Sequence, residues 1–583
     1  MTWHRSAVPT TYDQATTTVD PRWHGTPWQA ADLAAEFAAR LADQVGAGQV
    51  VVDHYRVGHR WAFPLPVADR PTGLPTAVGS LQHYPWLIWL TWELTERWDV
   101  LAGAWRTGDD DRAGQVLQRD LAALAGWPHF RNWRDEVGLP TGHLAMGLAR
   151  GLALPGWDAR WRAEAERAGR QLLDADVGDW FDRTWLRDAP LHNIPIIVLC
   201  SVAALAAQLD HHDAGRYRAR AVTAVEDWFT ARKRDRHTEQ TAYNGYLFDA
   251  VTQWMELDRA AGGDLVERWQ DPLTALCPEW VHSTVPGRAD LAVPLGDVES
   301  EMTMWLSCVT RLCEWYGVAA TSGAGWLLRR CAPPRLPADA LLRCLAGAVD
   351  ADPGPPATGP QELPTAVAVR DGWELDDPAV VVGLARVPVG HLHHDAGQVV
   401  LAWRGACWVT DPGYQQYRRG PEREYSIGPA AHNAPVVDGQ AQTQRDCQLL
   451  GTDPVVVDLS PAYAGLPDGA VVRRTVALTD DRLVVDDEVT GAGQQVITHW
   501  LAGARLAWAF VDGWVRWTDG TAALWCGTGT GPDDADRDLL DPDGVERHEG
   551  SRGPVGLRHA GTAGRRRWQF VWDRSGGWQP PRW

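Results

Sequence analysis

The stretch Ala351-Asp352-Pro353-Gly354-Pro355-Pro356-Ala357-Thr358-Gly359-Pro360 divides the chain into two parts with different sequence patterns. Proline lacks a backbone donor and clashes with the preceding helical turn, so this run can form neither a helix nor a central strand. It predicts a Pro/Gly linker, which we place at residues 351–363, between a first domain at 1–350 and a second at 364–583.

The part before the linker has the pattern of helices. Apolar residues recur three and four positions apart, which is the spacing of one buried helix face. Breakers at 138–142 and 261–264 separate the segments. Many helices in series, without a repeat of fixed length, predict a bundle, solenoid or toroid and argue against a tandem array. The expected helices are 28–45, 81–101, 113–127, 159–173, 193–209, 216–229, 246–260, 302–316 and 338–349.

The part after the linker has the pattern of strands. Short runs rich in valine and aromatic residues alternate with turns, such as Asp480-Asp481, and predict an antiparallel β-sandwich. The stretch 529–553 is acidic, contains Gly and Pro, and is expected to be a surface loop. The expected strands include 380–384, 399–403, 471–478, 482–489 and 568–572.

Composition narrows the classes of ligand. The 583 residues are enough for two or more structural units, and 45% hydrophobic with 22% charged residues is ordinary for globular proteins. A net charge of −20 repels nucleic acid, anionic membranes and, at long range, any polyanion, so an acidic ligand would need a local positive patch. The 34 tryptophans mostly serve core packing, but a few in a cleft would suffice to stack on sugar rings.

Cysteine usage and the N-terminus bear on the compartment. The nine cysteines are scattered, odd in number and without a C-x-x-C pair, which favours free buried thiols in a reducing compartment. The first twenty residues are polar and lack the pattern of a signal peptide, and the most apolar run, 194–209, is too short to span a membrane. We therefore expect a cytoplasmic protein that does not bind membranes.

Three segments between residues 390 and 440 carry histidines and carboxylates. They are Gly390-His391-Leu392-His393-His394-Asp395, Asp411-Pro412-Gly413-Tyr414 and His432-Asn433-Ala434-Pro435-Val436-Val437-Asp438-Gly439. Strands of one sheet can bring His393, Asp411 and His432 together, and two imidazoles with one carboxylate suit zinc. The bland alternative is a set of unconnected side chains.

The order of these segments resembles that of the heparinase II/III-like polysaccharide lyases, which carry G-H-x-H-x-D, D-P-G and H-N-x-x-x-V-D-G in their β-domain. The resemblance implies an N-terminal (α/α) toroid followed by a C-terminal antiparallel β-sandwich, with the substrate cleft between them. It also implies a structural Zn²⁺ held by His393, Asp411 and His432. His391 shares a strand face with His393 and is a candidate catalytic base.

In the helical part, the resemblance points to Asn193 and His192. An Asn at the start of a helix is most often an N-cap. The resembling lyases place an Asn here, usually followed by His, and its amide contacts the uronate carboxylate. In this chain Ile194 follows Asn193 and a histidine precedes it, so His192 is the expected substitute.

The segment from Thr238 to Tyr246 matches the spacing E-G-x-x-Y-x-x-Y of the same lyases through Glu239, Tyr243 and Tyr246. On a helix the two tyrosines share a face. One of them is expected to act as acid, base or both, and Glu239 to bind substrate. The sequence leaves open which tyrosine acts, and whether both simply border the core.

A third group lies in the loop between two of the expected metal ligands. Arg418, Arg419 and Arg423 would supply the local positive field, because guanidinium forks bind carboxylates. Tyr425 lies near a position where some of these lyases have a second catalytic tyrosine. The alternative is a solvated loop in which Glu422 and Glu424 pair with the arginines.

Together these residues suit β-elimination at a uronic acid, which needs a donor for the carboxylate, a base for the C5 proton and an acid for O4. The predicted function is a lyase that cleaves an acidic oligosaccharide or polysaccharide and leaves an unsaturated uronate end. The alternatives are a toroid glycoside hydrolase, which needs two carboxylates, a non-lyase carbohydrate-binding protein, and a lyase fold acting on a small metabolite. A homodimer is left open.

Overall fold

The computed structural model describes two compact units. Its described residues are 20–54, 59–72, 86–108, 110–132, 134–178, 180, 189–298, 303–349, 353–385, 391, 393–413, 421–440, 442–443, 447–503, 506–511, 513–528, 536–540 and 556–574. Of the described residues, the first unit contains those within Trp28–Cys277 and Met304–Pro353, and the second contains those within Pro9–Pro27, Pro278–Thr303 and Gly354–Trp583. Residues 278–303 thus contact the second unit, although they lie within the range predicted for the helical domain.

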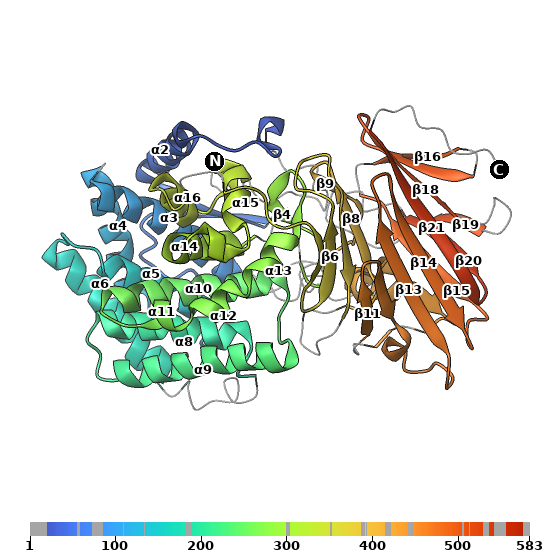
Figure 1. The fold of residues 1–583 in the computed structure, drawn as a ribbon. Helices are drawn as coiled ribbons and strands as arrows, with labels where there is room; N and C mark the ends of the chain where they lie inside the picture. Colours follow the sequence, from blue (N-terminus) through green and yellow to red (C-terminus); the bar gives the residue numbers. More distant parts are fainter. Residues whose placement is uncertain are drawn as a thin grey trace. The chain divides into compact units, whose positions relative to one another are not determined.

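The first unit is helical, as Figure 1 shows. A small hairpin of two strands, β1 (Gln49–His54) and β2 (His59–Pro64), accompanies the helices. The main helices are α2 (Ala30–Gly46), α3 (Trp86–Thr107), α4 (Asp111–Ala123), α5 (Leu139–Leu152), α6 (Ala159–Gln171), α8 (Asn193–Gln208), α9 (Ala214–Asp235), α10 (Thr241–Ala260), α14 (Trp305–Tyr316), α15 (Ala324–Arg330) and α16 (Ala338–Leu345).

Six of these helices close into a ring. α3 packs on α5, α5 on α8, α8 on α10, α10 on α14, α14 on α16, and α16 returns to α3. α8 is apolar all round and buried along its length, as expected of a helix with neighbours on every side. α2, α4, α6 and α9 pack on the ring and bury one face each. This arrangement is the predicted (α/α) toroid.

The stretch 138–142, which the sequence predicted as a breaker, instead begins a helix. Gly138 is the N-cap of α5, and Pro140 lies in the first turn. A proline is tolerated there because the first backbone N–H groups of a helix have no intrahelical partner. The signal that suggests a loop therefore marks the start of a ring helix.

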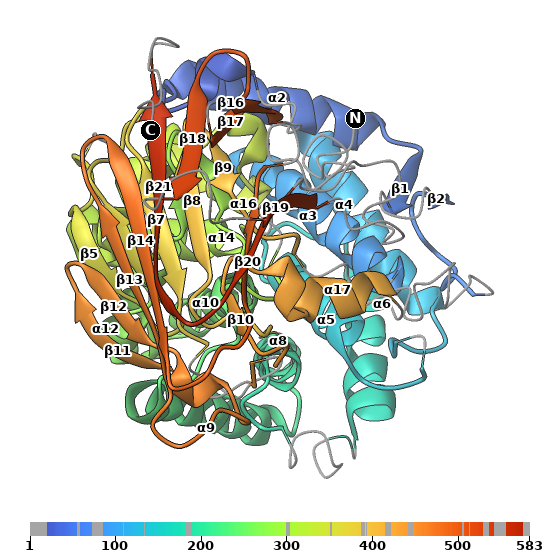
Figure 2. The same cartoon turned by 90° about the vertical axis from the view of Figure 1, so that its right-hand side faces the viewer.

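The second unit contains three main antiparallel sheets, with neighbouring strands side by side in Figure 1 and Figure 2. The five-stranded sheet runs in the order β5 (Gly359–Glu362), β6 (Ala366–Arg370), β7 (Ala379–Gly383), β8 (Val399–Trp403), β9 (Ala406–Val409). The eight-stranded sheet is β11 (Gln448–Thr452), β12 (Val455–Asp458), β13 (Val471–Leu478), β14 (Arg482–Thr490), β21 (Gly564–Asp573), β18 (Ala523–Thr528), β17 (Trp514–Thr518), β16 (Ala507–Val511). The four-stranded sheet is β10 (Pro435–Val437), β15 (Val496–Leu501), β20 (Gly556–Gly561), β19 (Asp536–Leu540).

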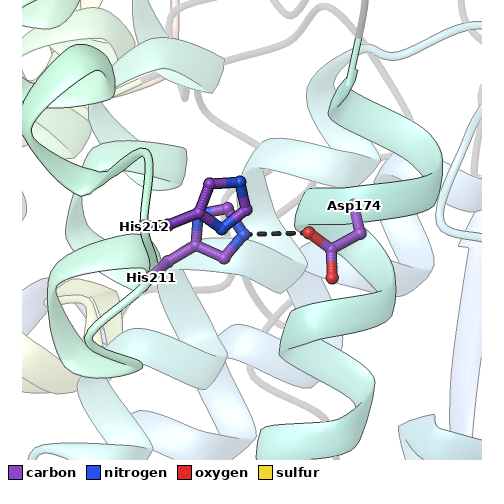
Figure 3. Close-up of side chains that lie close together, drawn as sticks. All are labelled: Asp174, His211 and His212. Atoms are coloured by element: carbon purple, nitrogen blue, oxygen red, sulfur yellow. Dashed lines mark hydrogen bonds and ion pairs between the residues drawn. The ribbon is translucent and has the colours of Figure 1, made fainter.

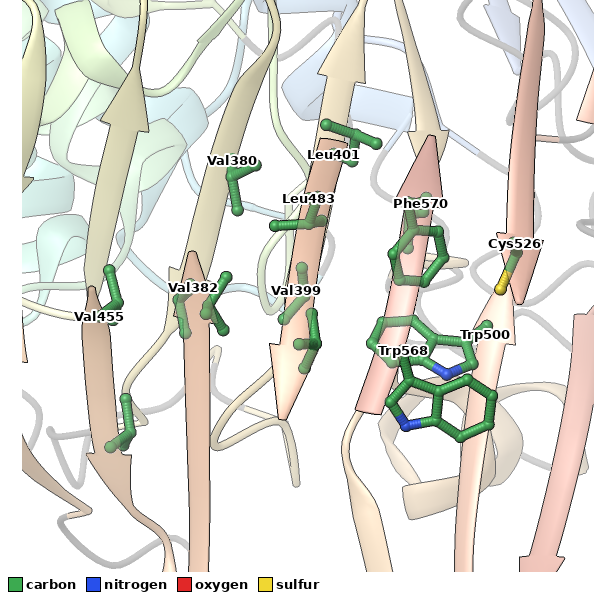
Figure 4. Close-up of a cluster of buried hydrophobic side chains, with 14 of the residues drawn as sticks. Val380, Val382, Val399, Leu401, Val455, Leu483, Trp500, Cys526, Trp568 and Phe570 are labelled. Atoms are coloured by element: carbon green, nitrogen blue, oxygen red, sulfur yellow. The ribbon is translucent and has the colours of Figure 1, made fainter. Parts of the chain in front are cut away.

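One hydrophobic core joins these sheets and confirms the predicted sandwich. Val380 and Leu401 of the five-stranded sheet, Leu483 and Phe570 of the eight-stranded sheet and Trp500 of the four-stranded sheet belong to one buried cluster (Figure 4). The opposite face of the five-stranded sheet is covered by apolar side chains from 285–295. That cover explains why residues 278–303 belong to this unit.

In the second unit, two short strands lie where the sequence predicted a linker and a loop. β5 begins at Gly359, inside the predicted linker, and is the edge strand of its sheet. An edge strand tolerates Pro360 because the missing N–H faces away from the ladder. β19 lies within 529–553, so the expected surface loop is wrong for residues 536–540. Strands 399–403 and 471–478 have the predicted bounds.

All nine cysteines are free and buried, as predicted. Among the described residues, no helix has both the length and the apolar character needed to cross a membrane.

Candidate functional site

The first cluster of predicted site residues lies at the start of α8. Asn193 is the first residue of this helix, and His192 caps it by accepting the backbone N–H of Ile194 on Nδ1 at 3.3 Å. Nδ2 of Asn193 donates to Oε2 of Glu239 at 2.5 Å, and Nε2 of His192 lies 3.7 Å from the same oxygen. Glu239 is buried in the segment that precedes α10. The cap is thus His192, while Asn193 turns its amide towards a carboxylate.

Tyr246 of α10 belongs to a directed chain of hydrogen bonds. The hydroxyl of Thr91 donates to the carbonyl of Ile88 at 2.8 Å and lies 2.7 Å from Nδ1 of His143. We assign the single hydroxyl hydrogen of Thr91 to the carbonyl of Ile88. Thr91 then accepts from Nδ1, and neutral His143 has its lone pair on Nε2. Nε2 of His143 is hydrogen-bonded to the hydroxyl of Tyr246, which is therefore the donor.

Burial sets the protonation of this pair. Burial lowers the pKa of His143 to about 3, so the imidazole is neutral near pH 7. Burial also raises the pKa of Tyr246, whereas a hydrogen bond with Trp92 acts in the opposite direction. The ring of Trp92 meets that of Tyr246 edge-on, with centroids 5.7 Å apart. Tyr243 lies one turn earlier on α10 and is half-buried.

His143 was missed by the sequence reading. His143 follows directly after the stretch 138–142, which the sequence predicts to interrupt a helix. The sequence therefore predicts no helix at His143. A single histidine at the start of an apolar helix gives no pattern that would mark it. Its partner Tyr246 lies 103 residues further along the chain.

A second cluster, in the β-rich unit, is organised by Asp297. Its carboxylate accepts from Nδ1 of His391 at 3.2 Å, from Nε2 of His393 at 2.8 Å and from Nη1 of Arg423 at 2.6 Å. Burial alone would raise the pKa of Asp297, but these two histidine hydrogen bonds and the charge of Arg423 lower it below its usual range. Asp297 was also missed, because it lies 94 residues before His391 and within the predicted helical domain.

The three predicted metal ligands do come together. His393, Asp411 and His432 are buried, and one ligand atom of each lies within 4.8 Å of the others. Nδ1 of His432 donates to Oδ2 of Asp411 at 2.9 Å, and Oδ1 of Asp411 accepts the backbone N–H of Gly413 at 2.7 Å.

Three buried polar atoms in this cluster have no hydrogen-bond partner among the described residues. They are Nδ1 of His393, Nε2 of His432 and Oδ1 of Asp395. Burial raises the pKa of Asp395, against the charges of His432 and His393. A buried polar atom without a partner costs free energy, and a cation bound by the two imidazoles would remove that cost. The donor set therefore fits zinc, and Asp395 is a further oxygen that the sequence reading did not use.

A similar group of residues in the helical unit has a different hydrogen-bond pattern (Figure 3). Asp174, His211 and His212 also bring their ligand atoms within 4.8 Å of one another. Here Nε2 of His211 donates to Asp174 at 2.9 Å, and Nδ1 accepts the backbone N–H of Asp213 at 3.2 Å. Since both ring nitrogens of His211 are used, this group works as a hydrogen-bond link between a π-helical turn (Leu172–Val177) and the loop before α9.

The remaining predicted residues lie around α17 (Pro421–Ile427). Arg423 pairs with Asp297, and Tyr425 is half-buried in the same helix. Arg418 and Arg419 lie outside the described residues.

Comparison with known proteins finds a family match within the second unit. Residues 372–532 match the family described as Heparinase II/III-like, C-terminal. That range contains His391, His393, Asp411 and His432, so the resemblance predicted from the motifs is confirmed. No curated protein matches the chain in sequence.

Solved structures of heparinases and of a chondroitin lyase share the fold. A crystal structure of heparinase III has 12% identity and a TM-score of 0.58, covering 98% of this chain and 88% of that one. The heparan sulfate lyase HepC from Pedobacter heparinus has 12% identity and a TM-score of 0.54, covering 99% and 88%. The Streptomyces coelicolor A3 chondroitin AC lyase has 12% identity and a TM-score of 0.50, covering 94% and 82%. At this identity the likeness shows the fold, the predicted toroid followed by antiparallel sheets.

Proposed function

We propose that this protein is a polysaccharide lyase that cleaves a uronic-acid-containing glycan by β-elimination. The observation that carries this proposal is the placement of a neutral amide, Asn193, and a phenol, Tyr246, on two neighbouring helices of the toroid ring. Elimination needs a donor for the uronate carboxylate and a group that moves a proton, and these two side chains supply both. The Heparinase II/III-like domain and the shared fold support the same reaction class.

Asn193 is the residue we assign to the substrate carboxylate. An amide nitrogen has two hydrogens, so it can donate to Glu239 and to a ligand at once. The first backbone N–H groups of α8 add a partial positive charge at the same helix end. The amide and these N–H groups stabilise the enolate-like negative charge that develops when C5 loses its proton. Stabilising that charge with fixed donors lowers the energy barrier of the reaction. Glu239 accepts from this amide and so orients Asn193.

Tyr246 is the residue we assign to proton transfer. Its oxygen accepts the C5 proton while its own phenolic hydrogen leaves along the existing hydrogen bond. The C5–H electron pair forms the C4–C5 double bond as the C4–O4 bond breaks, and the tyrosine oxygen then gives a proton to O4. A hydrogen bond with Trp92 also holds this oxygen in place. Trp89 and Trp92 are half-exposed, with ring centroids 6.4 Å apart, and give apolar faces on which a sugar ring can stack.

Zn²⁺ is the proposed metal, held by a ring nitrogen of His393, a ring nitrogen of His432 and a carboxylate oxygen of Asp411. Bound there, it would act structurally by cross-linking the segments that carry the three residues. Asp297 orients His393 by accepting from its other ring nitrogen, as carboxylates behind metal-bound histidines do. His391 shares that carboxylate, so its orientation depends on the same contact.

The proposed substrate is an acidic glycan, since the shared-fold proteins include a heparan sulfate lyase and a chondroitin AC lyase. The net charge of −20 disfavours long polyanions, so short oligosaccharides are the better first substrates. Hydrolysis is the less favoured reaction, because Glu239 is buried and already accepts from Asn193.

The test is a panel of heparan-, chondroitin- and alginate-type oligosaccharides, incubated with the full chain and followed by near-UV absorbance. A rise in absorbance that disappears in Tyr246→Phe would support elimination. Release of reducing ends without absorbance, with solvent oxygen in the product, would replace it with hydrolysis.

A further inference from the structure

We propose that His143 is a positioning residue for Tyr246: it holds the phenolic hydrogen away from substrate and receives it when Tyr246 accepts the C5 proton. This inference rests on the proposed lyase function and extends it to a residue behind the reacting group. Its basis is the direction of the hydrogen bonds that run from Tyr246 through His143 to Thr91.

The direction of the chain is fixed at its far end. The hydroxyl of Thr91 donates its only hydrogen to the carbonyl of Ile88, within the same helix α3. Thr91 can then only accept at Nδ1 of His143, which leaves Nε2 as a lone pair aimed at the tyrosine hydroxyl. The phenolic hydrogen therefore points to His143, and the lone pairs of the tyrosine oxygen accept other donors, Trp92 among them.

This arrangement moves the charge of the proton transfer from the tyrosine to the imidazole. Tyr246 alone would have to become a phenolate before acting as a base, and burial makes that costly. Burial also makes His143 hard to charge, so the relay depends on the negative charge that develops on the substrate at the same moment. With His143 behind it, the C5 proton moves to the tyrosine oxygen while the original phenolic hydrogen moves to Nε2. Tyr246 stays neutral, and the electron pair of the C5–H bond forms the C4–C5 double bond as the C4–O4 bond breaks. Tyr246 then gives a proton to O4 and regains its own from His143, so the net result is one proton moved from C5 to O4.

The alternative is a structural histidine whose two ring nitrogens are hydrogen-bonded but take no part in proton transfer. Such a residue would hold the tyrosine in place without taking its hydrogen. His143→Gln separates the two cases, because the glutamine carbonyl oxygen can accept the phenolic hydrogen bond but cannot store the proton. Thr91→Val removes the group that fixes the imidazole tautomer and leaves both His143 and Tyr246 in place.

The first measurement needs no substrate. In full-length protein labelled with ¹⁵N-histidine, the His143 signals are assigned by their loss in His143→Gln. We expect Nδ1 to carry the hydrogen and Nε2 to be unprotonated at pH 7, and we expect Thr91→Val to weaken that preference. A hydrogen on Nε2, or a charged imidazole at pH 7, would overturn the proposal.

The second measurement is kinetic. We expect His143→Gln to lower kcat on the order of a hundredfold with KM little changed, as for the loss of a proton-transfer group. His143→Ala should regain part of its activity when imidazole is added, which a purely structural role would not allow. A kcat within threefold of wild type in His143→Gln would overturn the relay. If no uronate is cleaved by the wild type while the ¹⁵N spectra show the expected tautomer, the lyase assignment fails and the hydrogen arrangement at His143 stands.

Discussion

Nε2 of His393 donates to Oδ1 of Asp297 at 2.8 Å, and Nδ1 of His393 is buried without a hydrogen-bond partner among the described residues. Nδ1 of His432 donates to Asp411, the third proposed ligand, and among the same residues its buried Nε2 has no partner either. A carboxylate behind an imidazole fixes the tautomer and makes the free nitrogen a better ligand. The structure therefore offers two preset imidazole nitrogens in a dry site, and a metal is the partner that such nitrogens suit.

The first prediction is one tightly bound zinc per chain. His393→Ala and His432→Ala should each lose it and should melt at lower temperature, because a structural metal contributes its binding free energy to folding. Elemental analysis of the purified protein and thermal denaturation measure the two effects. His211→Ala is the matched control from the other histidine cluster, and it should keep the metal. Metal-free wild-type protein with unchanged melting temperature would contradict the assignment.

The second prediction concerns the amide at the start of α8. Asn193→Ala should lower turnover on the order of a hundredfold, because it removes one donor to the charge that develops in the transition state. Steady-state kinetics on the best uronate oligosaccharide measure this loss. Near-normal turnover would mean that the carboxylate is bound elsewhere.

The third prediction tests whether Glu239 orients that amide. Glu239→Gln keeps an oxygen that accepts from Asn193 but removes the negative charge, so kcat should stay within about tenfold of wild type. Glu239→Ala should lose as much turnover as Asn193→Ala, because the amide is then free to rotate. If Glu239→Gln is as inactive as Glu239→Ala, the carboxylate itself takes part in the reaction.

The fourth prediction separates the two tyrosines of α10. Tyr246→Phe should abolish measurable elimination, since the hydroxyl that contacts His143 is removed. Tyr243→Phe should retain most activity and is the matched control on the same helix. Equal effects in both variants would place the reacting group outside this cluster.

Much of the fold was predictable because its elements are long and periodic. The apolar spacing of α4 and α14, and the alternating strands β13 and β14, carry their own signal along the sequence. The exceptions are short elements stabilised by neighbours. β5 forms although its sequence is Gly-Pro-Gln-Glu, because β6 pairs with it at the sheet edge. α5 begins at a Gly-Leu-Pro segment, because proline fits the first turn of a helix.

The site was predictable only where residues fall into a motif. His393, Asp411 and His432 belong to one ordered pattern, and the structure brings them together. Asp297 and His143 lie about a hundred residues from their partners and stand in no pattern with them. Their positions depend on how ring helices and covering strands pack. That packing cannot be predicted from a single sequence, because contacts between residues far apart in the chain produce no local sequence pattern.

The last prediction concerns the closure of the toroid ring between α3 and α16. Oε1 of Glu96, on α3, accepts the backbone N–H of Ala338 at the start of α16 at 2.9 Å and lies 3.3 Å from Nη1 of Arg40. Burial raises the pKa of Glu96 from 4.5 to about 7, and the nearby Asp99 and Asp339 add to this against the charge of Arg40. The folded protein therefore holds a proton at Glu96 that the unfolded chain has already lost.

The sign of the pH dependence follows from that difference. Below pH 4.5 both states are protonated and the contribution is fully present, and it is lost as the pH rises through the folded-state pKa near 7. The helical unit should lose roughly 3 kcal/mol from this group between pH 4.5 and pH 8. Glu96→Gln mimics the protonated carboxyl, so it should match wild type near pH 5 and exceed it at pH 8. Urea denaturation followed by far-UV circular dichroism measures the difference, with Glu164→Gln on the exposed face of α6 as control. A constant difference between Glu96→Gln and wild type across this range would show that Glu96 is ionised in the folded protein throughout.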